Sequence, residues 1–272
     1  MSEPVTGPSV PDPADPVDAA AVARFDAEHP GLELPPVAVV VAAYDEEAAV
    51  GDVVRALPSR IAGEEARVLV VVDGATDATA ARAREAGALV CDVPVNRGQG
   101  AALRLGYLLA RRGGARYIAT TDADGQYDAA DLDRVVAPLV AGTADFVSGS
   151  RVLGAAHTDD RTRALGVTVF AGLITLLTGR RVTDPANGLR AMRAEVAARV
   201  TLRQPQYQAA ELLIGAIAAG FRTTEVPTTM RARSAGSTKK GGNLLYGARF
   251  GRVVVGTWWR ERSGSPGKTT NS

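Results

Sequence analysis

The sequence predicts an α/β fold in which helices cover both faces of a mostly parallel sheet. From Val37 onward, short runs rich in β-branched residues alternate with longer amphipathic stretches. The predicted strands are continuously apolar, which is typical of strands buried on both faces. Ligands of such sheets bind beyond the carboxyl ends of the strands, so the residues that follow each strand are the first candidates for a site.

The elements follow in order from these local patterns. Apolar, β-branched runs predict strands at 37–43, 67–72, 89–93, 117–121 and 145–148. Amphipathic spacing predicts the intervening helices at 46–57, 77–86, 98–112 and 130–140. After Ser150 the pattern is less regular, with an apolar segment at 165–177, a helix at 209–219, a strand at 221–230 and a helix at 243–260.

Composition divides the chain into a central domain and two tails. Residues 1–34 are Pro-rich and carry seven acidic groups against one basic residue, Arg24, so we expect a disordered tail. Residues 35–262 are expected to form one fused domain, with a nucleotide-binding half at 35–150 and an acceptor half at 151–262. Residues 263–272 are expected to be a second disordered tail.

Charge and cysteine content exclude several classes of protein. A net charge of +1 gives no reason to expect a nucleic-acid partner. Cys91, the single cysteine, excludes an internal disulfide framework and a thiolate metal site. Without a secretory signal, the chain is expected to be cytoplasmic. The apolar segment 165–177, at about 13 residues, is shorter than the ~20 that span a bilayer, so it is either a core helix or a helix at a membrane surface.

A pair of aspartates follows the fourth predicted strand. The run Asp122-Ala123-Asp124-Gly125-Gln126 places two carboxylates and an amide where that strand ends. Mg²⁺ and Mn²⁺ prefer oxygen ligands and usually take one or two protein carboxylates together with substrate phosphate. A second Asp-x-Asp, at Asp131 and Asp133, fits the first turn of a helix, where acidic residues are common.

Polar turns also follow the first three strands, Tyr44-Asp45-Glu46, Asp73-Gly74 and Asn96-Arg97-Gly98, and the second and third of them carry a glycine. Gly98-Gln99-Gly100 lacks the third glycine of a dinucleotide fingerprint, because Leu103 occupies that position. These glycines are instead expected to let the helix approach the sheet. Between Phe221 and Arg252 basic residues dominate, and two of them, Lys239 and Lys240, lie in a Gly/Ser/Thr-rich stretch, 234–242, that suits phosphate capture; a solvated face is the alternative.

Several of these segments resemble motifs of one enzyme family in order and spacing. Residues 39–47 resemble a strand followed by Pro-x-Tyr-Asn-Glu-Glu, and residues 71–77 resemble an Asp-Asp-Gly-Ser element of which Asp73 is kept. The run at 122–126, Ser148-Gly149-Ser150-Arg151 and the turn 184–190 each have a counterpart. So does Glu225-Val226-Pro227 with the following Arg233 to Lys239. Over about residues 35–262 the chain resembles family 2 glycosyltransferases of the GT-A fold, most closely the polyprenyl-phosphate sugar synthases.

The resemblance implies a role for each matched residue. Tyr44, Glu46 and Asp73 would hold the base and ribose of a nucleoside-diphosphate sugar, a UDP- or GDP-hexose. Asp122, Asp124 and Gln126 would lie at the Mg²⁺ or Mn²⁺ ion. Arg151 would meet donor or acceptor phosphate, and Arg233 and Lys239 would meet the departing diphosphate on a glycine-hinged lid.

The implied chemistry is displacement at the anomeric carbon with inversion, and two kinds of acceptor remain open. A sugar hydroxyl needs a general base, for which Asp184 and Glu211 are candidates. A phosphate monoester is already ionised and needs cations, which the arginines at 151, 161, 163, 190 and 231 offer beside the apolar segment. We expect a polyprenyl phosphate and peripheral membrane contact, to which Trp258-Trp259 would add. The alternatives are a soluble or glycan acceptor, or a silent nucleotide-sugar binding module.

Overall fold

The computed structural model describes residues 13–156, 161–231 and 243–263. Its strands are β1 (Val37–Ala43), β2 (Arg60–Ile61), β3 (Glu64–Asp73), β4 (Leu89–Val93), β5 (Tyr117–Asp122), β6 (Phe146–Ala156), β7 (Arg190–Arg193) and β8 (Thr223–Met230). Its helices are α1 (Pro16–Glu28), α2 (Val50–Ala56), α3 (Thr79–Glu85), α4 (Gln99–Arg112), α5 (Asp131–Val140), α6 (Arg161–Thr178), α7 (Ala194–Arg199), α8 (Gln208–Ala218) and α9 (Asn243–Ser263).

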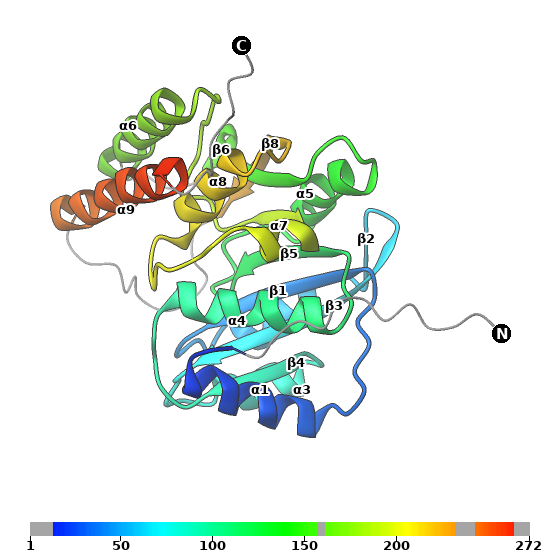
Figure 1. The fold of residues 1–272 in the computed structure, drawn as a ribbon. Coiled ribbons are helices and arrows are strands. Elements are labelled where there is room, and N and C mark those ends of the chain that lie inside the picture. Colours follow the sequence, from blue (N-terminus) through cyan, green and yellow to red (C-terminus); the bar gives the residue numbers. More distant parts are fainter. Residues whose placement is uncertain (1–12, 157–160, 232–242, 264–272) are drawn as a thin grey trace, which may run out of the picture.

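One sheet runs through both halves of the described chain (Figure 1). Its strands follow the order β2-β3-β1-β5-β7-β6-β8, and β4 also pairs with β3. The strands β4, β3, β1 and β5 are parallel neighbours, as the sequence predicts. Beyond them β7 pairs antiparallel with both β5 and β6, and β8 pairs parallel with β6. The sheet is therefore mixed, with a parallel half that carries the predicted strand ends.

Alternate residues of the strands enter two separate cores. In β1, Val37, Val39 and Val41 pack on the face covered by α2, α3 and α5. Ala38 and Val40 pack on the opposite face, which α1, α4 and α8 cover. Burying a Val or Leu side chain contributes roughly 1.5–3 kcal/mol, and a shift of one residue would exchange the two faces. The register of the parallel strands, and with it the position of each strand end, is thereby fixed.

Three glycines set how closely α4 approaches its neighbours. A Cβ on Gly106 would lie 2.3 Å from Cγ1 of Val40, so this glycine brings α4 close to the sheet. The sequence analysis predicts that Gly98 and Gly100 let α4 approach the sheet, and this prediction is wrong. A Cβ on either would instead collide with the backbone of residues 204–205, at 2.5 and 2.1 Å. Gly98 and Gly100 therefore allow a loop from the second half of the chain to pack on the start of α4.

The prediction of a disordered tail over residues 1–34 is wrong for residues 16–28, which form α1. The Asp15 side chain caps this helix by accepting from Val17 N at 2.8 Å. Ala21, Val22 and Phe25 are buried, and α1 packs on β4. The acidic and proline-rich composition of residues 1–34 predicts disorder, although these three apolar residues lie along one side of a short helix. Residues 1–12 and 264–272 of the predicted tails lie outside the described residues, and Ser263, the first residue of the second predicted tail, ends α9.

The apolar segment 165–177 belongs to α6, which lies beside α9 (Figure 1). The rings of Phe170 and Phe250 are 4.7 Å apart, and Trp258 Nε1 donates to the carbonyl of Leu177 at 2.7 Å. Of the two tryptophans Trp258 is half-buried, whereas Trp259 is 66% exposed. Among the helices of the described residues, none combines the length and apolar character needed to cross a bilayer.

Candidate active site

The order of the parallel strands reverses between β1 and β5. The chain passes from β1 outward to β3 and β4 and then returns through α4 to place β5 on the other side of β1. Such a reversal opens a crevice at the carboxyl ends of the two strands. Tyr44 follows β1, and Asp122 ends β5. The topology therefore brings the first and fourth predicted strand ends together.

The two aspartates at the end of β5 occupy different surroundings. Asp122 is half-buried, and its Oδ1 accepts from Gln99 Nε2 at 3.0 Å. A Cβ on Gly188 would lie 2.6 Å from Asp122 Oδ2, so a glycine at this position lets the 184–190 turn pack directly against the carboxylate. Asp124 is 6% exposed, and its Oδ1 accepts the N–H of Gln126 at 3.1 Å. The pair thus lies at the sheet edge with two carboxylates held in defined positions.

Gln126 is tied to the end of β8. Its carbonyl accepts from Arg231 N at 2.7 Å, and its Nε2 donates to the carbonyl of Arg231 at 3.1 Å. The first bond is made by the backbone of Gln126 and the second by its side chain, whose Nε2 is thereby directed to Arg231 at the end of β8. In the described ranges no group of three His, Cys, Asp or Glu side chains gathers as a metal site. A cation here would rest on the aspartate pair and on ligands from the substrate.

The predicted nucleotide-side residues lie on β1 and β3, the neighbours of β5. Tyr44 is 38% exposed, and the Asp45 carboxylate raises the pKa of its phenol. The N–H of Glu46 donates to Thr79 Oγ1 at 2.8 Å, which fixes the turn after β1. Asp73 is buried and accepts from the backbone of Arg97 and Gly98 at 3.0 and 2.7 Å. Burial raises the pKa of Asp73, and these N–H groups counter that rise.

Arg97, in the loop between β4 and α4, connects this loop to helix α1. The guanidinium of Arg97 pairs with Asp18, and with Asp15 at 3.2 Å. The sequence gives no sign of this contact, because Asp15 and Asp18 stand in a stretch predicted to be disordered. Gln99, which holds Asp122, is a second residue that the sequence analysis missed. Its position one residue after the third strand-end turn is the only signal that could have indicated it.

Arg151 and Asp184 form a buried, bidentate ion pair. Nε and Nη2 of Arg151 lie 2.6 and 2.7 Å from the two carboxylate oxygens of Asp184, and the N–H of Arg151 donates at 3.1 Å. The side chains are 9% and 0% exposed. Burial alone would raise the pKa of Asp184, but the hydrogen bonds and charge of Arg151 hold it below its usual value. Asp184 is therefore not placed to accept a proton from an acceptor.

The turn that carries Asp184 is locked from several sides. Glu225 accepts from Thr183 N and Asp184 N at 2.8 and 2.9 Å. Tyr127 Oη accepts from Gly188 N at 2.8 Å, and Nε of the buried Arg190 donates to the carbonyl of Asn187 at 2.7 Å. Since Gly188 also faces Asp122, this turn forms a rigid wall of the site.

Glu211, the other candidate base, is fully buried and accepts from the N–H groups of Arg203 and Gln204 and from Arg260. Its contacts indicate a structural task. Arg233 and Lys239 lie outside the described residues, as do the side chains of Arg161 and Arg163.

Comparison with known proteins identifies relatives that match most of this chain. The profile of Glycosyl transferase family 2 matches residues 38–201. A dolichyl-phosphate hexose transferase of Haloferax volcanii is 35% identical over 83% of this chain and 95% of its own length. A polyprenol monophosphomannose synthase of Mycolicibacterium smegmatis is 31% identical over 68% of this chain and 74% of its own.

Solved structures share the fold. Glucosyl-3-phosphoglycerate synthase from Mycobacterium tuberculosis, in complex with Mn²⁺, UDP and glucosyl-3-phosphoglycerate, superposes with a TM-score of 0.65. The match covers 94% of this chain and 87% of that one at 20% identity. At this identity the likeness shows the fold alone, and the fold is GT-A.

The buried ion pair predicts a large loss of stability in Asp184→Asn. Removing one partner of a buried pair costs about 3–5 kcal/mol, because it leaves the other charge uncompensated. Chemical denaturation at pH 7 measures this loss. Asp145→Asn is the matched control, since its bidentate partner Arg222 is largely exposed and the pair is worth much less.

The loss should also depend on pH. The pKa of Asp184 is lower in the folded state than the unfolded value of about 3.9. The stabilisation by ionised Asp184 is therefore complete above that pH and disappears as the pH falls through the folded-state pKa. The difference in the free energy of unfolding between wild type and Asp184→Asn should become smaller below about pH 4. Equal losses in the two variants at pH 7 would contradict the structural role of the pair.

Proposed function

The chain belongs to glycosyl transferase family 2, and from this premise we propose that it transfers a hexose from a nucleoside-diphosphate sugar to a polyprenyl phosphate with inversion. The observation that carries the proposal is the aspartate pair of β5 at the reversal of strand order. The names of two relatives, a dolichyl-phosphate hexose transferase and a polyprenol monophosphomannose synthase, support the acceptor class.

The donor would lie across the ends of β3, β1 and β5. Tyr44 offers an exposed ring face to the base, beside Glu46. Asp73 is buried and bonded to the 97–98 backbone, so its proposed task is to hold that loop beneath the nucleotide. The diphosphate would then meet Asp122 and Asp124. Arg233 and Lys239, which the sequence assigns to the leaving diphosphate, keep that role as a proposal.

The donor set fits a hard divalent cation. Two carboxylates at one strand end, Asp122 and Asp124, match the usual ligands of Mg²⁺ or Mn²⁺ at a phosphate site. Solved relatives of the same fold hold Mn²⁺ or Mg²⁺ with UDP. A cation bound here would neutralise charge on the departing diphosphate.

The acceptor class agrees with the buried state of the two candidate bases. In the proposed reaction an oxygen of the acceptor phosphate bonds to the anomeric carbon while the bond from that carbon to the donor's diphosphate breaks. A phosphate monoester is ionised near neutral pH and has no proton that a base must remove. Asp184 and Glu211 are both fully buried and bonded, so an acceptor that needs no base suits this site.

The same acceptor would require access to a lipid surface, and α6 and α9 carry exposed apolar side chains. Leu165, Val169 and Leu176 recur on one face of α6 and are 65%, 58% and 81% exposed. On α9, Val255 and Trp259 are exposed four residues apart. We propose that these faces contact the membrane without crossing it, at the side from which a polyprenyl chain would arrive.

A transfer assay tests the reaction. Incubation with labelled UDP- and GDP-hexoses, Mn²⁺ and a short-chain polyprenyl phosphate should move label into the organic phase. Asp124→Asn should lower the rate about 100-fold or more, because it weakens stabilisation of the departing diphosphate. Asp133→Asn, in the second Asp-x-Asp, is the matched control and should keep the rate, since its carboxylate accepts from Ala62 N in the turn between β2 and β3. Label confined to water-soluble products would instead favour a soluble acceptor.

Vesicle binding tests the membrane face. Leu176→Asp combined with Trp259→Ala should lower the vesicle-bound fraction about tenfold or more in flotation, because burying one such side chain is worth about 1.5–3 kcal/mol. Val140→Asp changes an exposed apolar residue of α5 and should bind as wild type. Unchanged binding of the double variant would refute the assignment of this face.

A further inference from the structure

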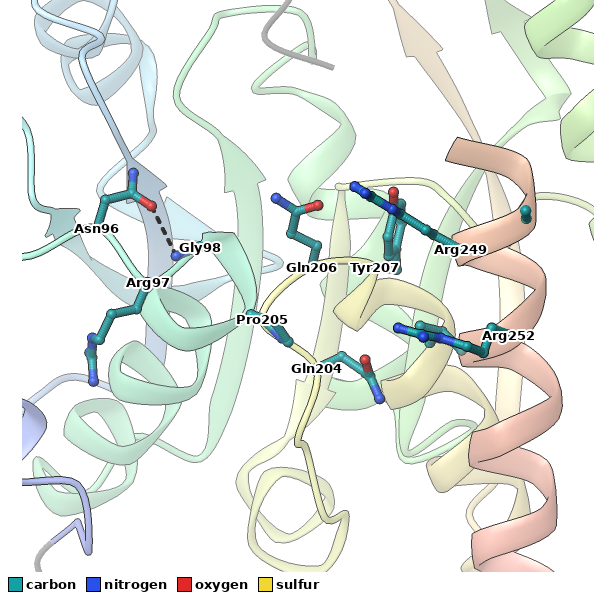
Figure 2. Close-up of a pocket in the computed structure, with 11 residues that line it drawn as sticks. Asn96, Arg97, Gly98, Gln204, Pro205, Gln206, Tyr207, Arg249 and Arg252 are labelled. Atoms are coloured by element: carbon teal, nitrogen blue, oxygen red, sulfur yellow. Dashed lines mark hydrogen bonds between the residues drawn. The ribbon is translucent and has the colours of Figure 1, made fainter. Parts of the chain in front are cut away.

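A cavity of about 770 Å³ lies between the two halves of the described chain (Figure 2). Its walls come from the start of α4, from the loop at 204–207 and from α9. Gly98 lines it, and the next residue, Gln99, holds Asp122. The cavity wall is therefore joined to the proposed reaction centre through adjacent residues.

The cavity is positively charged. Arg249 and Arg252 line it from α9, where a spacing of three residues puts them on one side of the helix. Figure 2 shows both side chains extending toward the 204–207 loop. None of the described lining residues is acidic, and the neutral polar groups of Gln204, Gln206 and Tyr207 complete the wall. Such a lining favours an anionic group of the ligand.

The two arginines have no partner among the described residues: neither forms an ion pair or a side-chain hydrogen bond there. The other described arginines that the sequence offers for an acceptor phosphate are engaged. Arg151 is paired with Asp184, Arg190 is buried against the Asn187 carbonyl, and Arg231 is paired with Asp128. A cationic acceptor site must therefore draw on other residues, and Arg249 and Arg252 are available.

The walls of the cavity are held in place by buried contacts. Glu211 accepts from Arg203 N and Gln204 N, and Arg260 of α9 reaches the same carboxylate at 2.8 Å. Gly100 N donates to the carbonyl of Pro205 at 2.8 Å. These bonds connect α4, the 204–207 loop and α9. The fully buried Glu211, which has no part in the proposed reaction, thereby holds the walls of the cavity in place.

We propose that Arg249 and Arg252 bind the phosphate of the polyprenyl-phosphate acceptor in this cavity. The proposal rests on the acceptor class proposed above. Further along α9 lie the exposed Val255 and Trp259, so an amphiphile with its phosphate at the arginines has an apolar surface for its chain on the same helix. The two arginines are binding residues for the acceptor, separate from the residues proposed for the donor.

Calorimetry with farnesyl phosphate tests the site independently of turnover. Arg249→Gln with Arg252→Gln should weaken farnesyl phosphate binding at least tenfold, because charge-assisted hydrogen bonds are lost. Farnesol, which lacks the phosphate, should bind wild type and variant alike. UDP affinity in the presence of Mn²⁺ should change less than twofold, which also shows that the variant is folded. Arg262→Gln removes an exposed charge from the same helix and should bind farnesyl phosphate as wild type.

The outcomes separate this site from the proposed function. Equal farnesyl phosphate affinity in wild type and double variant overturns the site, as does an equal loss of UDP affinity, which would place the arginines at the donor. If wild type transfers label to lipid and the double variant does so with an unchanged KM, the site fails while the function stands. If farnesyl phosphate binding depends on the arginines but no label reaches lipid, the site stands while the function fails.

Discussion

The reversal of strand order between β1 and β5 is the constraint on which the remaining structure depends. Because β5 returns beside β1, the residues after β3, β1 and β5 stand in a row at one edge of the sheet. Two apolar cores hold the register of these strands, so the row cannot shift without exposing one core. Tyr44, Asp73 and the aspartate pair owe their proximity to this topology.

A second layer of order comes from buried charge. The Arg151–Asp184 pair, Glu225 and Arg190 lock the turn that faces Asp122. Glu211 with Arg260 holds the loop that faces Gly98 and Gly100. These charged groups hold the turn and the loop that flank the carboxyl ends of the strands. They are themselves largely shielded from solvent. In this arrangement the two candidate bases, Asp184 and Glu211, are occupied by contacts with arginines and backbone N–H groups, which agrees with the proposed phosphate acceptor because it would need no base.

The sequence predicts the parallel half of the fold well, because buried strands and amphipathic helices leave clear periodicities. The bounds of β1 and β4 agree with the prediction, and the fold class is confirmed. β7 has four residues, two of them arginines, and carries no strand signal. Helix α1 is hidden by the composition of its neighbours. The ends of the predicted strands indicate where the site residues lie, but they do not indicate which side chains pair with one another. Arg151 and Asp184 are 33 residues apart in the sequence, and only the fold shows that each neutralises the other.

In the proposed reaction the cation and the diphosphate meet at the end of β5. Anomalous diffraction from crystals grown with Mn²⁺ and UDP would locate both. We expect one strong manganese peak within coordinating distance of carboxylate oxygens of Asp122 or Asp124, with the diphosphate bound to the same ion. A peak at Asp131 and Asp133, or bound UDP with no manganese at the aspartate pair, would contradict it.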